Sequence, residues 1–588
     1  MSHHPYYNPD FIITLLERKG LLDSKDARRV KSLSVLPGSK GSDIVQWIAG
    51  LRLEQNGKPG ETIGEAHILE LIAKVKGWAF ERLDPLKLDT DVVTKTLPLH
   101  FCKRRVCVPI RRDGSGLTFA VYDPLQKDLK FDISRACMMD VVFVVAPRED
   151  IKKIIEEFFE FRNSIKRAED LLKGPPGIDI SNLEQLVRIT GPQAASKEQH
   201  INAAVDYLLR YALDERASDI HMEPKRDYAK VRLRIDGVLH SIHKLPKVVH
   251  EAMVTRIKAL SRLDVAEKRR PQDGRMKIGW KDKEAEVRVS SVPVAFGEKI
   301  VLRIQTPEIL MKDLGELGMS ERDLVSYKTF LKKKYGIILI TGPTGSGKST
   351  TLYSTLRYLD DPGINIVTIE DPIEMICEAF NQIAVQPTVG ITFSSILRNI
   401  LRQDPDVIMI GEIRDQETAR YAVQAALTGH LVFSTLHTND AVGAVSRLGD
   451  LGLEHYLIAS TVIGVVAQRL VRTICSFCKV DETVNGKMLH PLGIRPGNEA
   501  VRLWRSKGCS RCRNTGFIGR IGIYEVLSIT DDIKEFIHGN APEAEIRGLA
   551  RRHGMTSLAF DAAQKVLRGV TTIDEALSVT GLNINPRA

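Results

Sequence analysis

The chain has 588 residues, which is too long for a single hydrophobic core and predicts three or four domains. Apolar residues make up 43% of it, and the formal net charge of +10 is modest for this length. No stretch approaches the roughly 18–20 consecutive apolar residues that span a bilayer. The first residues, Met1-Ser2-His3-His4-Pro5, show no secretory signal pattern. These features exclude a disordered, membrane-spanning or secreted class, and we expect a cytoplasmic protein.

Residues 1–163 predict a small α/β docking domain. Helices are expected within 10–35, from Ile63 to Val75 and from Asp150 to Phe161. Apolar, β-branched runs predict strands at 105–110, 117–122 and 141–145. Residues 164–198, which include Gly174-Pro175-Pro176-Gly177, predict a linker because they are rich in residues that break helices and strands.

A second domain is predicted over residues 199–312. A helix from Ile201 to Leu213 is followed by strands at 230–235, 286–290 and 300–304, and Asp236-Gly237 predicts a tight hairpin. Arginine alternates with apolar residues in these strands, so one face is buried and the other presents a row of guanidinium groups. Such a row suits phosphate or an acidic partner, although a solvated strand face is the simpler alternative.

The sequence pattern of the third domain, residues 313–588, predicts a mostly parallel sheet. Its four apolar runs are 337–341, 365–369, 407–410 and 431–435, with helical patterns between them. The runs are continuously apolar rather than alternating, which is typical of parallel strands covered by helices on both faces.

A glycine-rich turn follows the first of these strands and carries a phosphate-binding pattern. The turn reads Gly342-Pro343-Thr344-Gly345-Ser346-Gly347-Lys348-Ser349, and a helical pattern begins with Thr350. A strand, a glycine turn and a helix N-terminus in this order can surround phosphate with backbone amides. Lys348 is expected to reach the β- and γ-phosphates of a nucleoside triphosphate, and Ser349 is expected to bind Mg²⁺.

Acidic residues follow the next two strands, where ligands of parallel sheets bind. Glu412 is expected to activate or orient the attacking water. Glu370, Asp371 and Glu374 are expected to polarise that water or to hold metal-bound waters. Asp415 is instead expected to cap the helix that follows it.

Two histidines and several arginines complete the predicted site. His430 and His437 flank the last strand, and we expect both to sense the γ-phosphate by hydrogen bonding. Nearby arginines could supply charge to a transition state or to a subunit contact; they are Arg398, Arg402, Arg414 and Arg447.

Four cysteines form two Cys-x-x-Cys pairs, Cys475 with Cys478 and Cys509 with Cys512. In a cytoplasmic chain these pairs favour a closed, tetrahedral, structural zinc site within an insertion at about residues 470–520. A redox pair is the alternative.

Several blocks resemble one family, the secretion ATPases of type II secretion and type IV pilus assembly, over about residues 200–580. Residues 397–415 resemble its signature around the Walker B segment, 368–374 its aspartate box and 428–440 its histidine box. Residues 217–224 and 271–275 resemble the family's second N-terminal domain. Residues 1–160 resemble its first domain only loosely and lack the repeated Arg-Leu-Gly pattern of relatives that bind cyclic di-GMP, so no ligand is predicted there.

The resemblance implies a RecA-like P-loop ATPase domain preceded by two α+β domains, the second PAS-like. It also implies a homohexamer in which Arg288 and Arg303 of one subunit approach the γ-phosphate of a neighbour. An inner-membrane platform protein and a membrane-tethered cytoplasmic adaptor are the implied partners, which would hold the protein at the inner membrane. The cysteine insertion favours assembly or secretion over pilus retraction.

Three functions can use a nucleotide-binding domain of this kind. The first is a hexameric ATPase that assembles a pilus or pseudopilus. The second is a DNA-uptake or DNA-transfer ATPase, which is disfavoured because no basic patch is interleaved with aromatic residues. The third is a nucleotide-gated scaffold without turnover, which would not need the carboxylates that are present.

Overall fold

The computed structural model describes most of the chain. The described residues are 8–33, 44–51, 53–55, 58–83, 88–114, 116–161, 165–166, 168–169, 172, 192–280, 283–305, 310, 312–494, 500–509, 511–513 and 515–582. Most of the predicted linker, including residues 173–191, lies outside these ranges. Its last residues belong to a helix, α11 (Pro192–Asp214), which begins seven residues before residue 199, the expected start of the second domain. Proline suits this position because its missing amide has no partner in the first turn of a helix.

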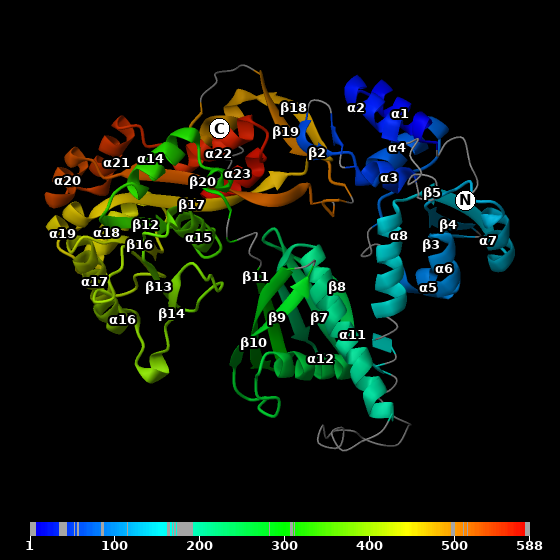
Figure 1. Ribbon diagram of the computed structural model, residues 1–588, viewed down its shortest axis with the longest axis horizontal. Helices are drawn as coiled ribbons and strands as arrows, with labels where there is room; N and C mark the ends of the chain where they lie inside the picture. Colours follow the sequence, from blue (N-terminus) through cyan, green and yellow to red (C-terminus); the bar gives the residue numbers. More distant parts are fainter. Residues whose placement is uncertain are drawn as a thin grey trace. The chain divides into compact units, whose positions relative to one another are not determined.

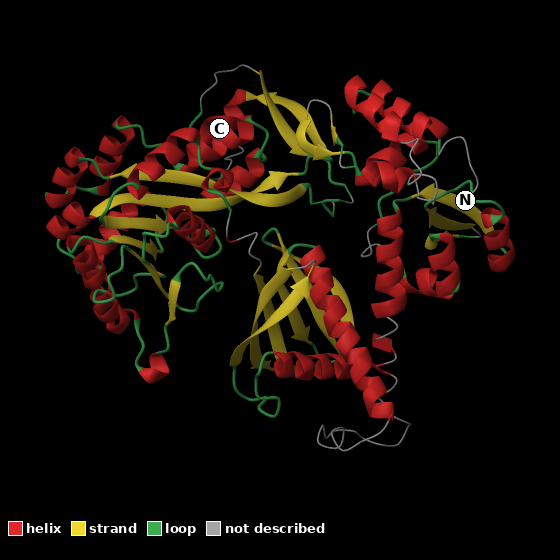
Figure 2. Ribbon diagram, in the orientation of Figure 1, coloured by secondary structure: helices red, strands yellow, loops and turns green. Residues whose placement is uncertain are grey.

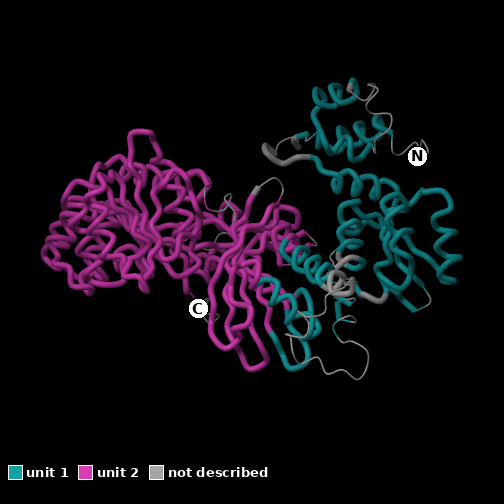
Figure 3. The backbone as a smooth tube through the Cα atoms, turned by 60° about the horizontal axis from the view of Figure 1, so that its bottom comes forward, with its two compact units in different colours: residues 1–209, 224–230, 242–257 teal, residues 210–223, 231–241, 258–588 magenta. Residues whose placement is uncertain are grey.

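The chain divides into two compact units (Figure 3). Unit 1 comprises residues 1–209, 224–230 and 242–257, and unit 2 comprises 210–223, 231–241 and 258–588. The division passes through the predicted second domain, so the boundaries at 163, 198 and 312 stay a prediction.

The N-terminal part of unit 1 is an α/β structure with one apolar core. Its three-stranded sheet has the order β3-β4-β5, with β3 antiparallel and β5 parallel to β4. The core includes Ile12, Leu69, Phe119 and Ile154, which are all buried. The elements are α1 (Pro9–Arg18), α2 (Ser24–Leu33), α3 (Ile44–Gly50), β1 (Glu54–Gln55), β2 (Lys58–Thr62), α4 (Glu65–Lys76), α5 (Thr90–Lys95), α6 (Leu99–Arg105), β3 (Cys107–Asp113), β4 (Gly116–Val121), α7 (Leu129–Cys137), β5 (Asp140–Val145), α8 (Arg148–Ile155) and the π-helical turn η4 (Glu156–Phe161).

A six-stranded sheet with the order β8-β7-β6-β11-β10-β9 follows. The predicted hairpin is confirmed: Asp236 and Gly237 both have positive φ, as a type I′ turn requires, and join β7 to its neighbour β8. The predicted alternation is also confirmed in β7, where Val231, Leu233 and Ile235 are buried and the arginines between them are half-buried. The elements after α11 are β6 (Ala217–Pro224), β7 (Tyr228–Ile235), β8 (Val238–Pro246), α12 (Lys247–Leu260), β9 (Gln272–Trp280), β10 (Lys283–Val294) and β11 (Gly297–Gln305).

The C-terminal part of unit 2 contains a seven-stranded sheet with the order β14-β13-β15-β16-β12-β17-β20 (Figure 1). All neighbouring strands are parallel except β17 and β20, which are antiparallel. The strands are β12 (Gly336–Thr341), β13 (Ile366–Glu370), β14 (Asn381–Ala384), β15 (Val407–Ile410), β16 (Leu431–Leu436), β17 (Val462–Ile474) and β20 (Phe517–Ser528). The prediction of a mostly parallel sheet is therefore confirmed.

Helices cover both faces of this sheet, as the continuous apolar runs predict (Figure 2). In β12, Ile337 and Leu339 join one apolar cluster, and Ile338 and Ile340 join the other. The helical elements are η5 (Leu314–Leu317), α14 (Glu321–Leu331), α15 (Lys348–Leu359), η6 (Pro387–Val389), α16 (Phe393–Ile400), α17 (Gln416–Leu427), α18 (Ala441–Asp450), α19 (His455–Thr461), α20 (Asp531–His538), α21 (Glu543–Arg552), α22 (Leu558–Leu567) and α23 (Ile573–Thr580).

The segment between β17 and β20 carries the four predicted cysteine ligands. It forms a separate antiparallel pair, β18 (Lys479–Asn485) and β19 (Ala500–Ser506), with the 3₁₀ turn η7 (Gly486–Leu492) between them. Among the described helices, none combines the length and the apolarity that crossing a bilayer requires.

We predict that Leu339→Ala destabilises the protein by about 2–5 kcal/mol, because it opens a cavity in the central strand. Leu339 is fully buried, whereas Leu427 is 58% exposed and provides a matched control. Equilibrium denaturation followed by circular dichroism would measure both variants. An equal effect of Leu427→Ala and Leu339→Ala would contradict this description of the core.

Candidate functional site

A cavity of about 610 Å³ lies at the carboxyl ends of β12, β13, β15 and β16. Its lining brings together most of the residues that the sequence singled out. From the glycine-rich turn it includes every residue from Pro343 to Thr350, and from the later strands Glu370, Asp371, Glu374, Glu412 and His437. Arg288 and Arg303, from β10 and β11 of the same chain, also line it.

The glycine-rich turn leads directly into helix α15, whose first residue is Lys348. Gly345 and Gly347 have φ values of 80° and 90°, which lets the backbone curl around a central space. The ammonium group of Lys348 donates to the carbonyl oxygen of Gly342 over 2.6 Å. Gly342 itself does not appear in the cavity lining. The turn thus has the shape of an anion cradle at a helix N-terminus.

Glu412 lies among basic side chains of the cavity, namely Arg414, His437 and Lys348. It forms an ion pair with Arg414, and its Oε2 lies 3.6 Å from Nε2 of His437. Burial lowers the pKa of Lys348, and the charge of Glu412 opposes that shift. Burial also lowers the pKa of His437, and the positive charge of Lys348 acts in the same direction. The imidazole is therefore neutral at pH 7 and able to accept or donate a hydrogen bond.

Glu370 differs from the other predicted acids because its carboxylate is already bonded within the protein. Its Oε1 accepts from the Thr368 hydroxyl at 2.8 Å and from the Gln382 amide at 3.1 Å. Its Oε2 accepts from the Tyr353 hydroxyl at 2.7 Å and from the Glu374 amide at 3.3 Å. With about four acceptor positions on a carboxylate, Glu370 can bind a water only after exchanging one of these bonds.

Glu374 connects the acidic segment to the arginine-bearing strands. Its Oε2 lies 2.8 Å from Nη1 of Arg288 and 2.5 Å from the side-chain amide of Gln305. Arg288 also donates to the carbonyl of Ile373. Arg303 pairs instead with Asp219, over 3.0 Å, and remains 59% exposed at its side chain. Both arginines are therefore close to the cavity, in different environments.

The two predicted histidines do not lie together in this chain, and the role of His430 at a phosphate stays a prediction. β16 pairs with β12 from Gly336↔Leu431 to Thr341↔Leu436, so the residues just before and just after β16 lie at opposite ends of the sheet. His437 follows the carboxyl end and lines the cavity. His430 precedes the other end, where its Nδ1 lies 2.9 Å from the carbonyl of Ala425.

Of the four further arginines, only Arg414 is in the cavity lining. Arg398 binds the Tyr421 hydroxyl, and Arg402 binds Asn399. The predicted cap is confirmed, since the carboxylate of Asp415 accepts from the amide of Thr418 at 2.8 Å. Sequence reasoning missed several lining residues that carry no recognisable motif; they are Gln305, Phe393, Leu470 and Arg520.

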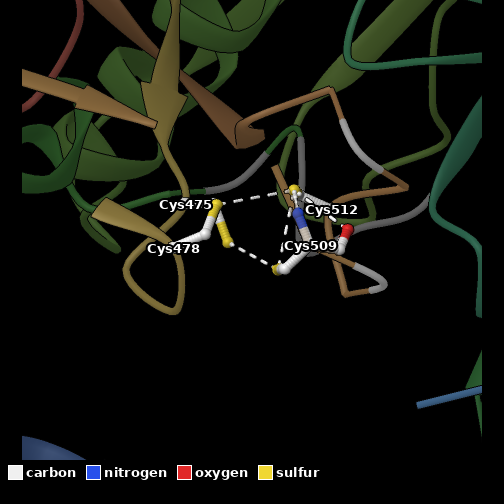
Figure 4. Close-up of side chains that lie close together, drawn as sticks. All are labelled: Cys475, Cys478, Cys509 and Cys512. Carbon is white, nitrogen blue, oxygen red and sulfur yellow. Dashed lines mark hydrogen bonds between the residues drawn. The ribbon is translucent and has the colours of Figure 1, made fainter. Parts of the chain in front are cut away.

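The four predicted cysteines gather into one cluster, with two side chains from each Cys-x-x-Cys pair facing the other two (Figure 4). The sulfur of Cys475 lies 3.8 Å from that of Cys509, Cys478 lies 3.8 Å from Cys512, and Cys509 lies 3.7 Å from Cys512. These separations are far longer than the roughly 2.05 Å of a disulfide. They match the edge of a tetrahedron about 3.8 Å long, which four sulfurs form at about 2.3 Å from a zinc ion.

The surroundings of this cluster favour the thiolate at Cys512 and disfavour it at Cys475 and Cys478. Burial raises the pKa of the Cys512 thiol, but hydrogen bonds from the amides of Cys509 and Gly516 outweigh it and bring that pKa below its usual value. Burial raises the pKa of Cys475 to about 11. The four sulfurs lie close enough together to hold one metal ion, which would keep all of them deprotonated.

Comparison with known proteins finds matches over almost the whole chain. Residues 194–578 match the family described as "Type II/IV secretion system protein", and residues 77–164 match the MshEN domain. The type IV pilus assembly ATPase TfpB of Acinetobacter baylyi is 37% identical over 590 residues, covering 99% of this chain and 100% of that protein. PilB of Myxococcus xanthus, also a type IV pilus assembly ATPase, is 36% identical over 570 residues, covering 96% and 98%.

A further relative matches more closely over a shorter region. The type II secretion system protein E of Pseudomonas aeruginosa is 47% identical over 376 residues, covering 64% of this chain and 74% of that protein. The phosphate-binding turn, the acidic cluster and these matches agree, and the chain belongs to the type II/IV secretion system protein family.

Proposed function

We propose that this chain hydrolyses ATP as a cytoplasmic homohexamer and uses the energy to assemble a pilus or a pseudopilus. The observation that carries the proposal is the cavity in which the glycine-rich turn, Lys348 and Glu412 meet. The names of the relatives support it, because two of them are pilus assembly ATPases and one is a type II secretion protein.

The chemistry follows from the positions of the side chains. The amides of the turn and Lys348 would hold the phosphates, and Ser349 would hold Mg²⁺. Bound Mg²⁺ would offset the charge that develops on the β- and γ-phosphates. Glu412 would orient the attacking water, with Asp371 and Glu374 holding further waters at the same face. His437 would donate to the γ-phosphate as a neutral imidazole.

Arg288 and Arg303 would supply positive charge to the γ-phosphate. Both line the cavity, and cationic side chains in this position stabilise the transition state of phosphoryl transfer. In the structure, Arg288 pairs with Glu374 and Arg303 pairs with Asp219. If both arginines left these acids to bind the γ-phosphate, ATP binding would change the position of the domain that carries them. In the hexamer, these contacts would close the junction between two neighbouring subunits. The hexamer would act on an inner-membrane platform protein and would be held at the membrane by a membrane-tethered adaptor.

The cysteine cluster would hold one structural Zn²⁺. Four sulfur ligands leave no open coordination position, so the ion would stabilise the insertion rather than take part in hydrolysis.

We predict that Lys348→Ala and Glu412→Gln each lower the ATPase rate at least about a hundredfold, because the first removes a positive charge from the phosphates and the second removes the carboxylate that orients the water. Glu412→Gln should retain nucleotide binding, since it changes the water-orienting group and leaves the phosphate cradle intact. Phosphate release and binding of a fluorescent ADP analogue would separate the two effects. Lys332→Ala and Glu535→Gln, at exposed positions in the same domain, are the matched controls. Full turnover in Glu412→Gln would contradict the assigned role.

A mixing experiment tests which subunit supplies the arginines. Arg288→Ala should abolish turnover when present in every subunit. If Arg288 acts on a neighbour's nucleotide, mixing Arg288→Ala with Glu412→Gln subunits should restore part of the activity, because some junctions then combine an intact arginine with an intact glutamate. A mixture that stays inactive would place both residues in the site of one chain.

Zinc content gives an independent test of the metal site. We predict about one zinc per chain in the purified protein, and its loss in Cys478→Ser together with a lower melting temperature. Atomic absorption and thermal denaturation would measure both. Cys137→Ser, at a half-buried cysteine outside the cluster, should keep its zinc. A metal-free wild-type protein of full stability would rule the site out.

A further inference from the structure

The side chain of Gln468 lies against the phosphate-binding turn, far from it in sequence. Its Nε2 donates to the carbonyl oxygen of Ser346 at 2.8 Å, and its Oε1 accepts from the hydroxyl of Thr351 at 2.7 Å. Ser346 belongs to the turn, and Thr351 belongs to the first turn of α15. One amide therefore bridges the two parts of the structure that would surround the phosphates.

All three partners are shielded from water. Gln468 and Thr351 are each 1% exposed and Ser346 is 4% exposed. A buried hydrogen bond has no water to replace a lost partner, so removing one leaves an unsatisfied polar group. The orientation of the amide is also fixed, because the Ser346 carbonyl can only accept and must face the nitrogen rather than the oxygen of the amide.

The backbone of β17 adds a steric constraint at the same place. β17 pairs with β12 up to Thr341↔Ala467, so Gln468 is the first residue that runs beside the turn itself. A Cβ atom on Gly342 would lie 2.4 Å from the carbonyl oxygen of Gln468, closer than any real contact. The turn is thus held from one side by the backbone of β17 and by the side chain that extends from it.

We propose that Gln468 is a positioning residue for nucleotide binding, which sets the shape of the phosphate-binding turn by bridging Ser346 and Thr351. Its side chain makes its hydrogen bonds with Ser346 and Thr351, so it would act on ATP through the backbone amides of the turn. This inference rests on the proposed ATPase function and adds a residue to it. Changing Gln468 should therefore weaken nucleotide binding and leave the catalytic step largely intact.

The direct test compares Gln468→Glu and Gln468→Met in the full-length protein. We expect the KM for ATP and the Kd for a fluorescent ADP analogue to rise about tenfold in both, as the loss of a buried hydrogen bond implies. kcat should change by less than about threefold, because the groups that act on the transition state are unchanged. Thr351→Val should reproduce the binding defect, and Thr351→Ser, which keeps the hydroxyl, should lose less affinity than Thr351→Val.

The pH dependence separates a positioning role from general loss of packing. Burial raises the pKa of a carboxyl introduced by Gln468→Glu, and its protonated form can again donate to the Ser346 carbonyl. The affinity of this variant relative to wild type should therefore improve from pH 8.5 to pH 6, and that of Gln468→Met should not. Gln424→Glu, an exposed change of the same kind on α17, should bind and turn over ATP as wild type does.

Two results would count against the inference while leaving the ATPase function standing. One is wild-type nucleotide affinity in Gln468→Glu at both pH values. The other is an equal loss of affinity in Gln468→Glu and Gln468→Met that does not change with pH. A wild-type protein that binds no nucleotide would instead overturn the proposed function, and the inference with it.

Discussion

The nucleotide site depends on one backbone constraint, the tight turn between β12 and α15. Its amides must point inward, and the carbonyl of Ser346 accepts from the side chain of Gln468 in a place that water cannot reach. The sheet supports the turn. β16 lies on one side of β12 and β17 on the other, and the hydroxyl of Thr341, at the end of β12, donates to the carbonyl of Leu436 at 3.1 Å.

The parallel sheet also explains why residues from distant segments meet at the turn. Each parallel strand ends at the same edge, so Glu370, Glu412 and His437 arrive there from three different strands. Their charges are arranged in pairs: Glu412 with Arg414, and Glu374 with Arg288. The oxygens of a triphosphate could take over the arginines, and its Mg²⁺ could then offset the charge of the carboxylates that the arginines leave. These acidic and basic side chains are therefore already paired before a nucleotide binds.

Much of this could be predicted from the sequence because the relevant signals are local. The phosphate-binding turn, the four apolar strands and the paired cysteines each lie in one short stretch with a direct physical meaning. Other features depend on contacts between distant segments. Gln468 lies 122 residues from Ser346, and a single glutamine in an apolar strand carries no local signal. β14 was missed because Asn381 and Gln382 give it a polar sequence at the edge of the sheet.

The separation of His430 from His437 has a simple geometric cause. Two residues that flank a strand are neighbours in a sequence pattern, but a six-residue strand separates them by about 20 Å. The role of Glu370 was also incompletely predicted, because its bonds come from Tyr353 and Gln382 on other elements.

The central claim concerns where the triphosphate binds, and a crystal structure with a non-hydrolysable ATP analogue and Mg²⁺ tests it most directly. The account predicts phosphate oxygens on the amides of residues 345–350, with Lys348 turned from Gly342 towards them and Glu412 facing the γ-phosphate. An analogue bound elsewhere, with that turn empty, would contradict it.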